Sequence, residues 1–365
     1  FNGPESFTPD DRYLLGQTPE VDNLYCACGF NSVGILSSGG VGRSLADWIV
    51  NNEPPMDLGD VDIRRMQPFQ KNRQYLYERT TETLGALMDM HWPAKQWETS
   101  RDLRRSALHD RLVARGAAMT EAAAFERPGF FVRGDEPKDW TYSYSHQSWF
   151  GSVAREVANT HGRVTLTDQS CYTKFRVEGR DSVKVLNRIC AAEVDVPVGR
   201  VVYTQWLNHK GGIEADVTVT RLSETAFLIV SIAASQTRDK IWIERNIPEG
   251  AYCFVFDATS GLSMLTLMGP NARSLLSEVA CEDLSDNAFP FGTSREIEIG
   301  HATVRATRLT YVGELGWELF VPTEMVQYVY DRLHKAGQAY GLDDGGFFAV
   351  NAMRIEKGYR HWGHD

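Results

Sequence analysis

Hydrophobic and polar residues alternate along the segment GGIEADVTVTRL, residues 211–222. The alternating positions are Ile213, Glu214, Ala215, Asp216, Val217, Thr218, Val219 and Thr220. This period-two pattern predicts a β-strand that buries its apolar face and carries both acids on its polar face. The preceding segment VGRVVYTQWLN also has strand character, and the turn HKGG between the two predicts a β-hairpin.

The pattern changes at residue 136, and from there strands and helices follow one another without a strict β-α-β rhythm. We predict strands in RVTLTDQSCYTKFRVEG (two strands and a turn), AFLIVSIA, YCFVFDAT, LSMLTLMG, ATVRATRLTYV and GWELFVP. We predict helices in SHQSWFGSVAREVANTHG, RDSVKVLNRICAAEVD, QTRDKIWIERNI, PNARSLLSEVA and TEMVQYVYDRLHKAGQAYG. This mixture favours an α+β fold with antiparallel sheets over a doubly wound parallel sheet.

The N-terminal third has weaker patterns. Residues Tyr25–Cys28 predict a short strand, and the glycine cluster in SSGGVG predicts a tight turn that opens a helix at Ser44–Val50. Glycines in such a place could also let backbone amides approach a ligand. Residues 53–108 have a polar, mostly helical pattern, and we interpret the basic stretch SRDLRRSALHDRLVARG as a solvated helical face and not a nucleic-acid patch.

Length, composition and charge narrow the class of protein. A chain of 365 residues with 42% hydrophobic and 24% charged residues is typical of a globular protein of two or three domains. The net charge of −10 argues against nucleic acid or an anionic membrane as a partner. No apolar run reaches the roughly 20 residues of a membrane helix. The six cysteines have no zinc-ligand spacing, which favours reduced thiols. No targeting segment is visible, and both ends indicate an internal fragment of a longer protein.

Two stretches carry candidate chemistry. In the predicted hairpin, Tyr203 comes opposite the Asp216 region, so an aromatic ring and a carboxylate could share a face. The segment TYVGELGWELF contains Gly313 and Gly316, and Glu314 and Glu318 follow these glycines. A carboxylate can accept two parallel N–H bonds from an aminopyrimidine edge. Each stretch alone is more often the polar face of a strand. The terminal histidines in GYRHWGHD are more typical of a loop than of a metal site.

These two stretches resemble the folate-binding aminomethyltransferase domain, which occurs as the T-protein of glycine cleavage and in sarcosine and dimethylglycine dehydrogenases. The similarity extends to DQSCYTKFRVEG, VVYTQWLN, NAFPFGTS and RIEKGYRHWGHD, and the segments GPESFTPD, CGFNSVGILSSGGVGRSLADWIV and DIRRMQP resemble the end of a flavin domain and the connecting domain after it. The resemblance implies residues 1–52 as the tail of an FAD-dependent oxidoreductase domain, 53–108 as the connecting domain, and 109–365 as the T-protein-like folate-binding domain without its final β domain.

The resemblance also implies an activity. A flavin would oxidise an N-methylated amine such as sarcosine or dimethylglycine, and tetrahydrofolate would capture the one-carbon unit as 5,10-methylenetetrahydrofolate. FAD and tetrahydrofolate are then the cofactors, no metal is expected, and another protein could accept the electrons. The location would be the cytoplasm in a bacterium or the mitochondrial matrix in a eukaryote. The pyruvate dehydrogenase phosphatase regulatory subunit is similar too, so a non-catalytic relative and a stand-alone aminomethyltransferase remain as alternatives.

The resemblance assigns roles residue by residue. Asp216 takes the place of the catalytic aspartate beside the folate nitrogens. The implied folate-pocket residues are Tyr203, Tyr311, Glu318 and Tyr172, and those implied near the flavin are Gly29, Asn31, Gly34 and Ile35. T-proteins are expected to have an arginine where this sequence has Val350, which leaves one folate contact open.

Overall fold

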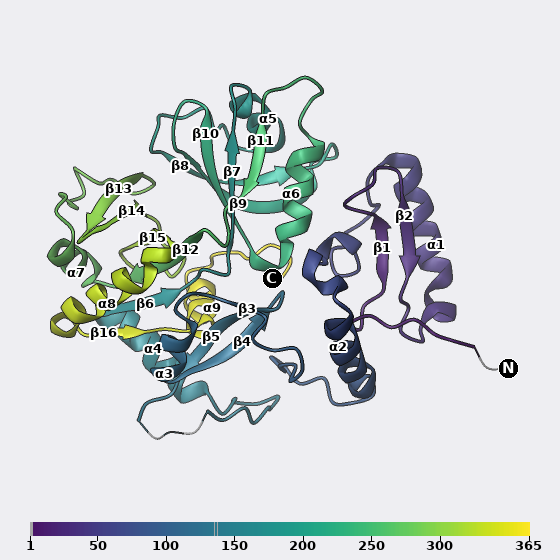
Figure 1. Ribbon diagram of the computed structural model, residues 1–365, viewed down its shortest axis with the longest axis horizontal. Coiled ribbons are helices and arrows are strands. Elements are labelled where there is room, and N and C mark those ends of the chain that lie inside the picture. The colour runs from purple at the N-terminus through teal and green to yellow at the C-terminus, as the bar shows by residue number, and fades with distance from the viewer. Residues whose placement is uncertain (1–2, 135, 137) are drawn as a thin grey trace.

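A computed structural model of the chain describes residues 3–134, 136 and 138–365. It has an N-terminal part beside a larger body, and the chain ends close to the centre of the molecule (Figure 1). The N-terminal part contains β1 (Leu14–Gln17), β2 (Tyr25–Cys28), α1 (Gly34–Asn51), α2 (Arg73–Ala86) and 3-10 helices at Ile63–Arg65 and Pro68–Lys71. The antiparallel pair β1–β2 packs against α1, whose Trp48 is buried.

The body contains three sheets. A three-stranded sheet, in the order β3-β5-β4, is made of β3 (Arg104–Arg105), β4 (Ala117–Ala122) and β5 (Phe125–Phe131). A five-stranded sheet, in the order β11-β7-β10-β9-β8, is made of β7 (Thr173–Glu178), β8 (Val201–Leu207), β9 (Ile213–Arg221), β10 (Ala226–Ser231) and β11 (Phe254–Asp257). A six-stranded sheet, in the order β13-β14-β15-β12-β6-β16, is made of β6 (Val164–Asp168), β12 (Leu262–Met268), β13 (Ser294–Ile299), β14 (Ala302–Thr307), β15 (Gly316–Pro322) and β16 (Leu342–Asp344).

Helices flank these sheets. They are α3 (His109–Ala114), α4 (Phe150–Gly162), α5 (Ser182–Ile189), α6 (Gln236–Arg245), α7 (Ala272–Val279), α8 (Val326–Gly337) and α9 (Phe347–Glu356), with 3-10 turns at Ala233–Ser235, Thr323–Met325 and Gln338–Tyr340. Among the described strands of the body, only β3–β5 and β6–β16 pair in parallel. The predicted α+β class with antiparallel sheets and flanking helices is therefore confirmed.

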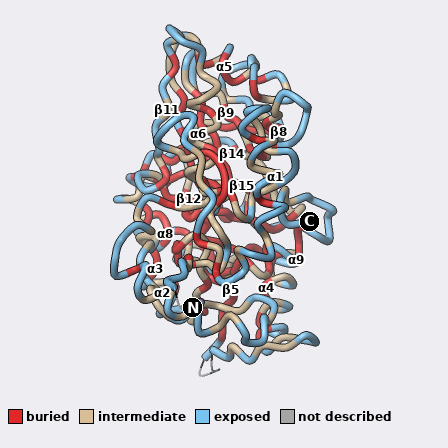
Figure 2. The backbone as a smooth tube through the Cα atoms, turned by 90° about the vertical axis from the view of Figure 1, so that its right-hand side faces the viewer, coloured by how far each residue is buried: buried red, intermediate tan, exposed pale blue. Residues whose placement is uncertain are grey.

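Each large sheet has its own apolar core. Trp317, Leu319 and Val321 of β15 are buried against α7 and α8, and Phe175 and Val177 of β7 are buried beneath α5. Figure 2 shows this burial as red backbone along the central strands. The two cores are separate, and the candidate site lies between the two sheets, where neither core extends. Within the described residues, no helix has the length and apolar character that crossing a membrane requires.

The predicted hairpin is confirmed, with one difference at its turn. Strands β8 and β9 pair antiparallel, with Gln205 opposite Asp216. Ala215 and Val217 are buried as expected, but Ile213 is 43% exposed. The register shifts between Trp206 and the next residue, so the alternation does not continue to the end of the strand beside the turn.

Two N-terminal predictions are wrong. Helix α1 begins at Gly34, ten residues before the predicted start, because its glycines at 39, 40 and 42 lie inside the helix facing open space. The basic stretch is not one solvated helical face. It forms the two residues of β3 and the short helix α3, in which Leu112 is buried, and the stretch also supplies Arg101 to an ion pair with Glu126. The pattern also left out the hairpin of β4 and β5, strand β13 and helix α9.

Candidate functional site

A cavity of about 570 Å³ lies where the five-stranded and six-stranded sheets meet. It receives side chains from β9, β10, β15, the loops before β7 and after β14, and the last residues of the chain. Its lining residues include the predicted Asp216, Tyr203, Tyr311, Glu318 and Tyr172, together with His361, Arg360, Tyr359, Met264, Phe291 and Ser231. All five residues of the predicted folate group therefore line one cavity.

Asp216 and Tyr203 form a hydrogen-bonded pair on the wall made by the hairpin. The Tyr203 hydroxyl donates to Oδ2 of Asp216 at 2.9 Å. Burial raises the pKa of Asp216, although the Tyr203 hydroxyl and the backbone N–H of Trp362 oppose the rise. Burial, with the nearby Asp216 charge, raises the pKa of Tyr203 to about 12, so this hydroxyl remains a donor at neutral pH. A half-shielded carboxylate of this kind can accept a proton from a bound ligand.

The neighbouring acid, Glu214, has a different environment. It forms an ion pair with Arg238 of α6, Nη2 to Oε2 at 2.9 Å, and accepts a hydrogen bond from Asn208 at 3.1 Å. Glu214 does not line the cavity. Its charge is already compensated, which leaves Asp216 as the available carboxylate on this strand.

Glu318 is a buried acid of the cavity that lacks a hydrogen-bond donor among the described residues. It lies in the middle of β15, between Thr266 of β12 and Thr307 of β14. Its Oε2 atom is buried, and no described residue donates a hydrogen bond to it. Burial raises the pKa of Glu318 to about 7. A buried acceptor without a donor in an otherwise apolar wall fits a ligand that brings its own N–H groups.

Two aromatic residues complete the walls. Tyr311 follows β14 on a loop, where its ring stacks on Tyr359 with centroids 6.4 Å apart. Tyr172 lies between β6 and β7, beside Phe347 of α9, with ring centroids 6.1 Å apart. Burial raises the pKa of Tyr311 to about 12 and that of Tyr172 further. Flat apolar faces near a carboxylate are suited to an aromatic heterocycle.

The C-terminal segment contributes residues that the sequence pattern did not select. His361 lines the cavity, and its Nε2 is buried without a partner among the described residues. Burial and the neighbouring His364 lower the pKa of His361 to about 4, so the ring is neutral near pH 7. The rings of the two histidines stack with centroids 3.9 Å apart. No group of three metal-ligating side chains occurs in the described part of the chain.

The four residues implied near the flavin do not line this cavity, and they lie after β2 and at the start of α1 in the N-terminal part. The Asn31 side chain is buried and accepts a hydrogen bond from the Thr8 backbone at 2.8 Å. Gly29 has φ +69°, which glycine adopts without strain. Gly34 and Ile35 begin α1, where Ile35 is 97% exposed. Gly29 and Asn31 are buried, Ile35 is exposed, and none of the four lines the cavity, so the structure brings together only the folate group.

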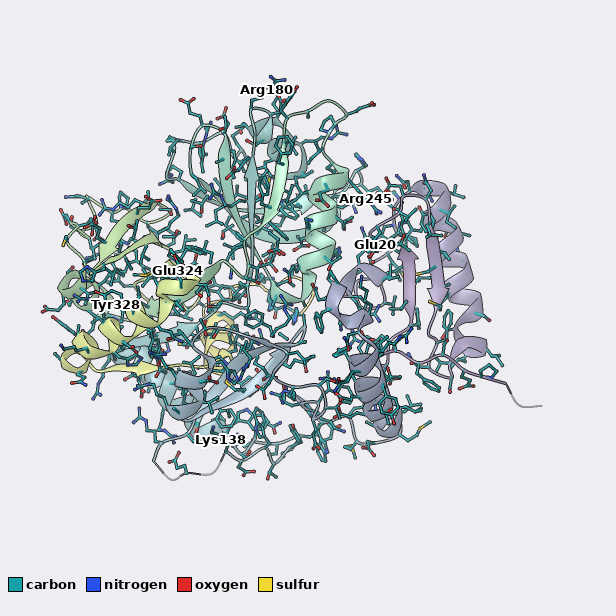
Figure 3. The ribbon with its side chains drawn as sticks, viewed as in Figure 1. Glu20, Lys138, Arg180, Arg245, Glu324 and Tyr328 are labelled. Atoms are coloured by element: carbon teal, nitrogen blue, oxygen red, sulfur yellow. The ribbon has the colours of Figure 1, made fainter. Side chains whose placement is uncertain are left out.

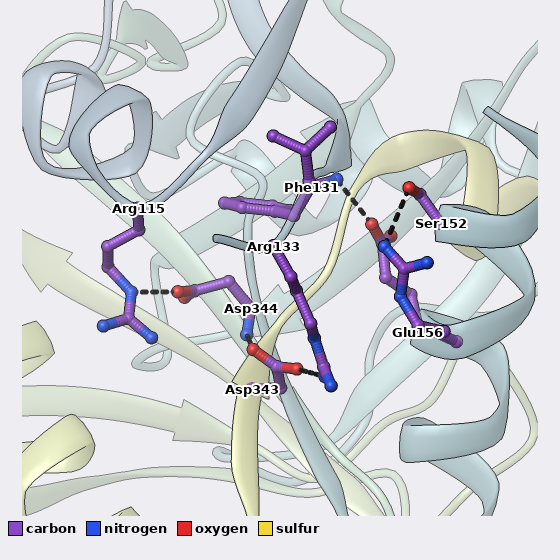
Figure 4. Close-up of a pocket in the computed structure, with 9 residues that line it drawn as sticks. Arg115, Phe131, Arg133, Ser152, Glu156, Asp343 and Asp344 are labelled. Atoms are coloured by element: carbon purple, nitrogen blue, oxygen red, sulfur yellow. Dashed lines mark hydrogen bonds and ion pairs between the residues drawn. The ribbon is translucent and has the colours of Figure 1, made fainter. Parts of the chain in front are cut away.

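A second hollow, at the end of β5 beside α4 and β16, is too small for a substrate. Figure 4 shows this cavity of about 40 Å³, lined by three arginines and three carboxylates. Arg115 pairs with Asp344, and Arg133 pairs with Asp343. The Glu156 carboxylate accepts hydrogen bonds from the backbone of Phe131 and Gly346. These ion pairs and hydrogen bonds join β5, α4 and β16. Their charged groups already have partners within the chain, so they stabilise the fold and do not form a ligand site.

Comparisons with known proteins match both parts of the chain. The family described as GCVT N-terminal domain matches residues 108–365, and the FAD dependent oxidoreductase central domain matches residues 51–106. The crystal structure of glycine cleavage system aminomethyltransferase T from Bartonella henselae has a TM-score of 0.59 at 23% identity, covering 71% of this chain and 64% of that one, which shows the shared fold.

Three curated relatives align along the whole chain. The 4-methylaminobutanoate oxidase (formaldehyde-forming) of Paenarthrobacter nicotinovorans is 41% identical, and the alignment covers 100% of this chain and 44% of the relative. The mitochondrial pyruvate dehydrogenase phosphatase regulatory subunit of Mus musculus is 33% identical, with 100% and 42% covered. The mitochondrial sarcosine dehydrogenase of Homo sapiens is 33% identical, with 100% and 44% covered. The chain thus spans less than half the length of these relatives.

Proposed function

Because the chain belongs to the GCVT N-terminal domain family, we propose that its cavity binds tetrahydrofolate and that the whole protein transfers a one-carbon unit to it from an N-methylated amine. The match of residues 51–106 to an FAD dependent oxidoreductase central domain supports a flavin in the same protein. Such a flavin would oxidise the N-methyl group to an iminium, and a separate protein would accept the electrons. In this proposal Gly29, Asn31, Gly34 and Ile35 lie on the flavin side.

The buried, unpartnered Oε2 of Glu318 carries this proposal. The aminopyrimidine edge of a pterin presents adjacent N–H donors, and a carboxylate can accept two of them in parallel. Tyr311 and Tyr172 supply apolar faces on which the ring can pack. The cavity volume of about 570 Å³ falls in the usual range for a small-molecule site. The residues present therefore fit a folate.

Asp216 would serve the transfer step. As the iminium carbon bonds to one folate nitrogen and then to the second, the two N–H groups lose two protons in all. One proton goes to the leaving amine, and the other needs a base. The Asp216 carboxylate can accept it, and burial makes that carboxylate a stronger base than one in water. The Tyr203 hydroxyl holds the carboxylate in place.

Replacing Asp216 by asparagine tests this assignment. In the complete protein, Asp216→Asn should keep folate affinity within a few-fold and slow formation of methylenetetrahydrofolate by about 10²-fold or more, the range of general base catalysis. The measurements are a tetrahydrofolate titration and single-turnover product analysis with sarcosine or dimethylglycine. The matched control is Asp331→Asn, at an exposed acid paired with Arg111. Product formation by Asp216→Asn at the parent rate would exclude the proposed role.

The unsubstituted protein decides between the enzyme and a regulatory relative. If the complete protein binds tetrahydrofolate and converts an N-methylated amine to methylenetetrahydrofolate, the enzymatic proposal holds. If it yields no methylenetetrahydrofolate with sarcosine, dimethylglycine or 4-methylaminobutanoate, the proposal fails. The similarity to the phosphatase regulatory subunit would then favour a regulatory, non-catalytic function.

A further inference from the structure

Arg127, in the middle of β5, is a cation without a counter-ion. Its Nε atom is buried and has no hydrogen-bond partner. Within the described ranges, no carboxylate lies within salt-bridge distance of its guanidinium, and no oxygen accepts a hydrogen bond from its side chain. An arginine keeps its charge under all ordinary conditions, so burying part of it without an anion is costly.

The surroundings hold this guanidinium in a fixed place. Its carbon lies 4.2 Å from the centre of the Phe347 ring, in a cation–π contact with the first turn of α9. The backbone of Arg127 is paired with Thr120 of β4, so the side chain is anchored on a rigid strand. The side chain also contacts the buried Cys171 thiol, which accepts a weak hydrogen bond from it. This arrangement orients a planar fork of donors and leaves it without an anion.

The acidic residues of the β4–β5 hairpin form ion pairs with arginines other than Arg127. Glu126, the residue before Arg127, forms a bidentate pair with Arg101, with both contacts at 2.6 Å. Glu121 of β4 accepts hydrogen bonds from the buried Arg79. Two acids are thus close in sequence and still leave Arg127 unpaired, which points to an anion from outside the chain.

Arg127 lies next to the candidate site. Phe347, which it covers, lies beside Tyr172 with the two rings tilted, and Tyr172 is part of the cavity wall. The positive charge of Arg127 also contributes to lowering the pKa of His361, another residue of that wall. The unpaired guanidinium is therefore near the end of the cavity formed by Tyr172 and His361.

We propose that Arg127 binds the carboxylate of the one-carbon donor while its iminium reacts at the folate, an inference that rests on the proposed function above. The substrates named in two relatives, 4-methylaminobutanoate and sarcosine, are both N-methylated amino acids with a carboxylate. A carboxylate fits the fork of a guanidinium with two parallel hydrogen bonds. Arg127 would thus act as a positioning residue that selects carboxylate-bearing amines.

A binding experiment on the complete protein, kept anaerobic with its flavin reduced so that no amine is oxidised, tests this role apart from turnover. The probes are N,N-dimethylglycine and N,N-dimethylethanolamine, which share the amine and differ in the carboxylate, titrated with and without 5-formyltetrahydrofolate. We expect dimethylglycine to bind more tightly than dimethylethanolamine. Arg127→Gln should weaken dimethylglycine binding about tenfold or more and leave dimethylethanolamine unchanged. Arg127→Lys should give an intermediate loss, because lysine keeps the charge without the fork.

Two arginine variants control for charge alone. Arg360 also lines the cavity, but its side chain is exposed. Arg180 lies far away, at the end of the lobe that carries the five-stranded sheet, where it covers Tyr252 (Figure 3). Arg180→Gln should keep the preference for dimethylglycine, and any loss of that preference in Arg360→Gln should be smaller than in Arg127→Gln. Equal binding of the two probes, or a preference lost in Arg360→Gln and kept in Arg127→Gln, would overturn the proposal.

The outcomes also separate this inference from the proposed function. A chain that does not bind 5-formyltetrahydrofolate contradicts the folate proposal, whatever Arg127 does. A chain that binds it, with dimethylglycine affinity unaffected by Arg127→Gln, keeps the folate proposal and removes the carboxylate subsite. Thermal melting of each variant shows that the fold is retained, and unchanged affinity for 5-formyltetrahydrofolate shows that the cavity is intact.

Discussion

Two carboxylates of β9, Glu214 and Asp216, are two residues apart on one strand and have opposite surroundings. Arg238, from α6, compensates the charge of Glu214, whereas Asp216 has only uncharged donors, the hydroxyl of Tyr203 and the backbone N–H of Trp362, and lines the cavity. Alternation cannot separate the two acids because both belong to the polar set. The difference arises from a partner that comes from another element.

Glu318 should give folate binding a pH dependence. The carboxylate must be ionised to accept two N–H bonds, and its pKa lies at about 7 in the free cavity. The ionised fraction therefore rises about tenfold from pH 6 to pH 8, so the folate dissociation constant should fall by about the same factor. Glu318→Gln should remove this pH dependence and bind about tenfold more weakly at pH 8.

The matched control is Glu314→Gln, because Glu314 lies on the loop before β15 and contacts His161 and not the cavity. Its folate affinity should follow the pH profile of the unsubstituted chain. Calorimetric titration with 5-formyltetrahydrofolate at pH 6, 7 and 8 measures all three proteins. A pH profile that persists in Glu318→Gln would assign the titration to another group.

At the scale of elements, the C-terminal segment forms one wall of the cavity, and a buried ion pair joins it to α9. Arg354 of α9 donates to both carboxylate oxygens of Asp365, at 2.8 and 3.0 Å, and to the Tyr359 carbonyl. The His361 backbone donates to the same carboxylate at 2.6 Å. The guanidinium is buried, so this contact is better shielded from solvent than a surface ion pair.

Arg354→Met should release this segment from the cavity. Without the guanidinium, residues 358–365 lose the group that joins them to α9, so their amide hydrogens should exchange faster. Folate affinity should fall several-fold because Tyr359 and His361 no longer hold the wall. Hydrogen exchange followed by mass spectrometry measures the first effect. Arg111→Met, at an exposed pair with Asp331, is the control and should leave both quantities unchanged.

The local sequence pattern predicted helices and strands best where one face of the element is buried in a single apolar core. The β8–β9 hairpin follows from alternation because its apolar side chains enter one core. Helix α1 was placed wrongly because glycines usually end helices, whereas here they face open space and only Trp48 and Val41 are buried. The resemblance, and not periodicity, selected Asp216 and Glu318, and Arg127 carries no local signal at all.

At the scale of the whole molecule, long-range packing creates the site. Tyr172 and Tyr311 follow strands of the six-stranded sheet, whereas Tyr203 and Asp216 belong to the five-stranded sheet, so their meeting depends on how the sheets pack. Helix α6 also joins the body to the N-terminal part, since Arg245 donates to the Gln17 side chain at 2.8 Å, near the labelled Glu20 (Figure 3). Such contacts leave no local trace in a sequence.

Three buried carboxyl groups should make the stability of the chain fall as pH rises. Burial raises the pKa of Glu156 to about 8, of Glu318 to about 7 and of Asp239 to about 6. A raised pKa in the folded state means that the folded chain binds more protons than the unfolded one between the two pKa values. The free energy of unfolding therefore decreases with pH across that window. Groups with lowered pKa values, such as Asp344, lose their contribution only under more acidic conditions.

Glu318→Gln isolates the contribution of Glu318 to the pH dependence of the free energy of unfolding. The amide does not titrate, so the variant should lose the part of the pH slope that lies between about pH 4.5 and 7, at most about 3 kcal/mol for a shift of this size. Melting curves of both proteins from pH 5 to 8 measure it, and the stability of the variant relative to the parent should rise with pH across this range. A constant difference between the two proteins would show that Glu318 ionises in the folded chain as readily as in water, and its carboxylate would then be solvated.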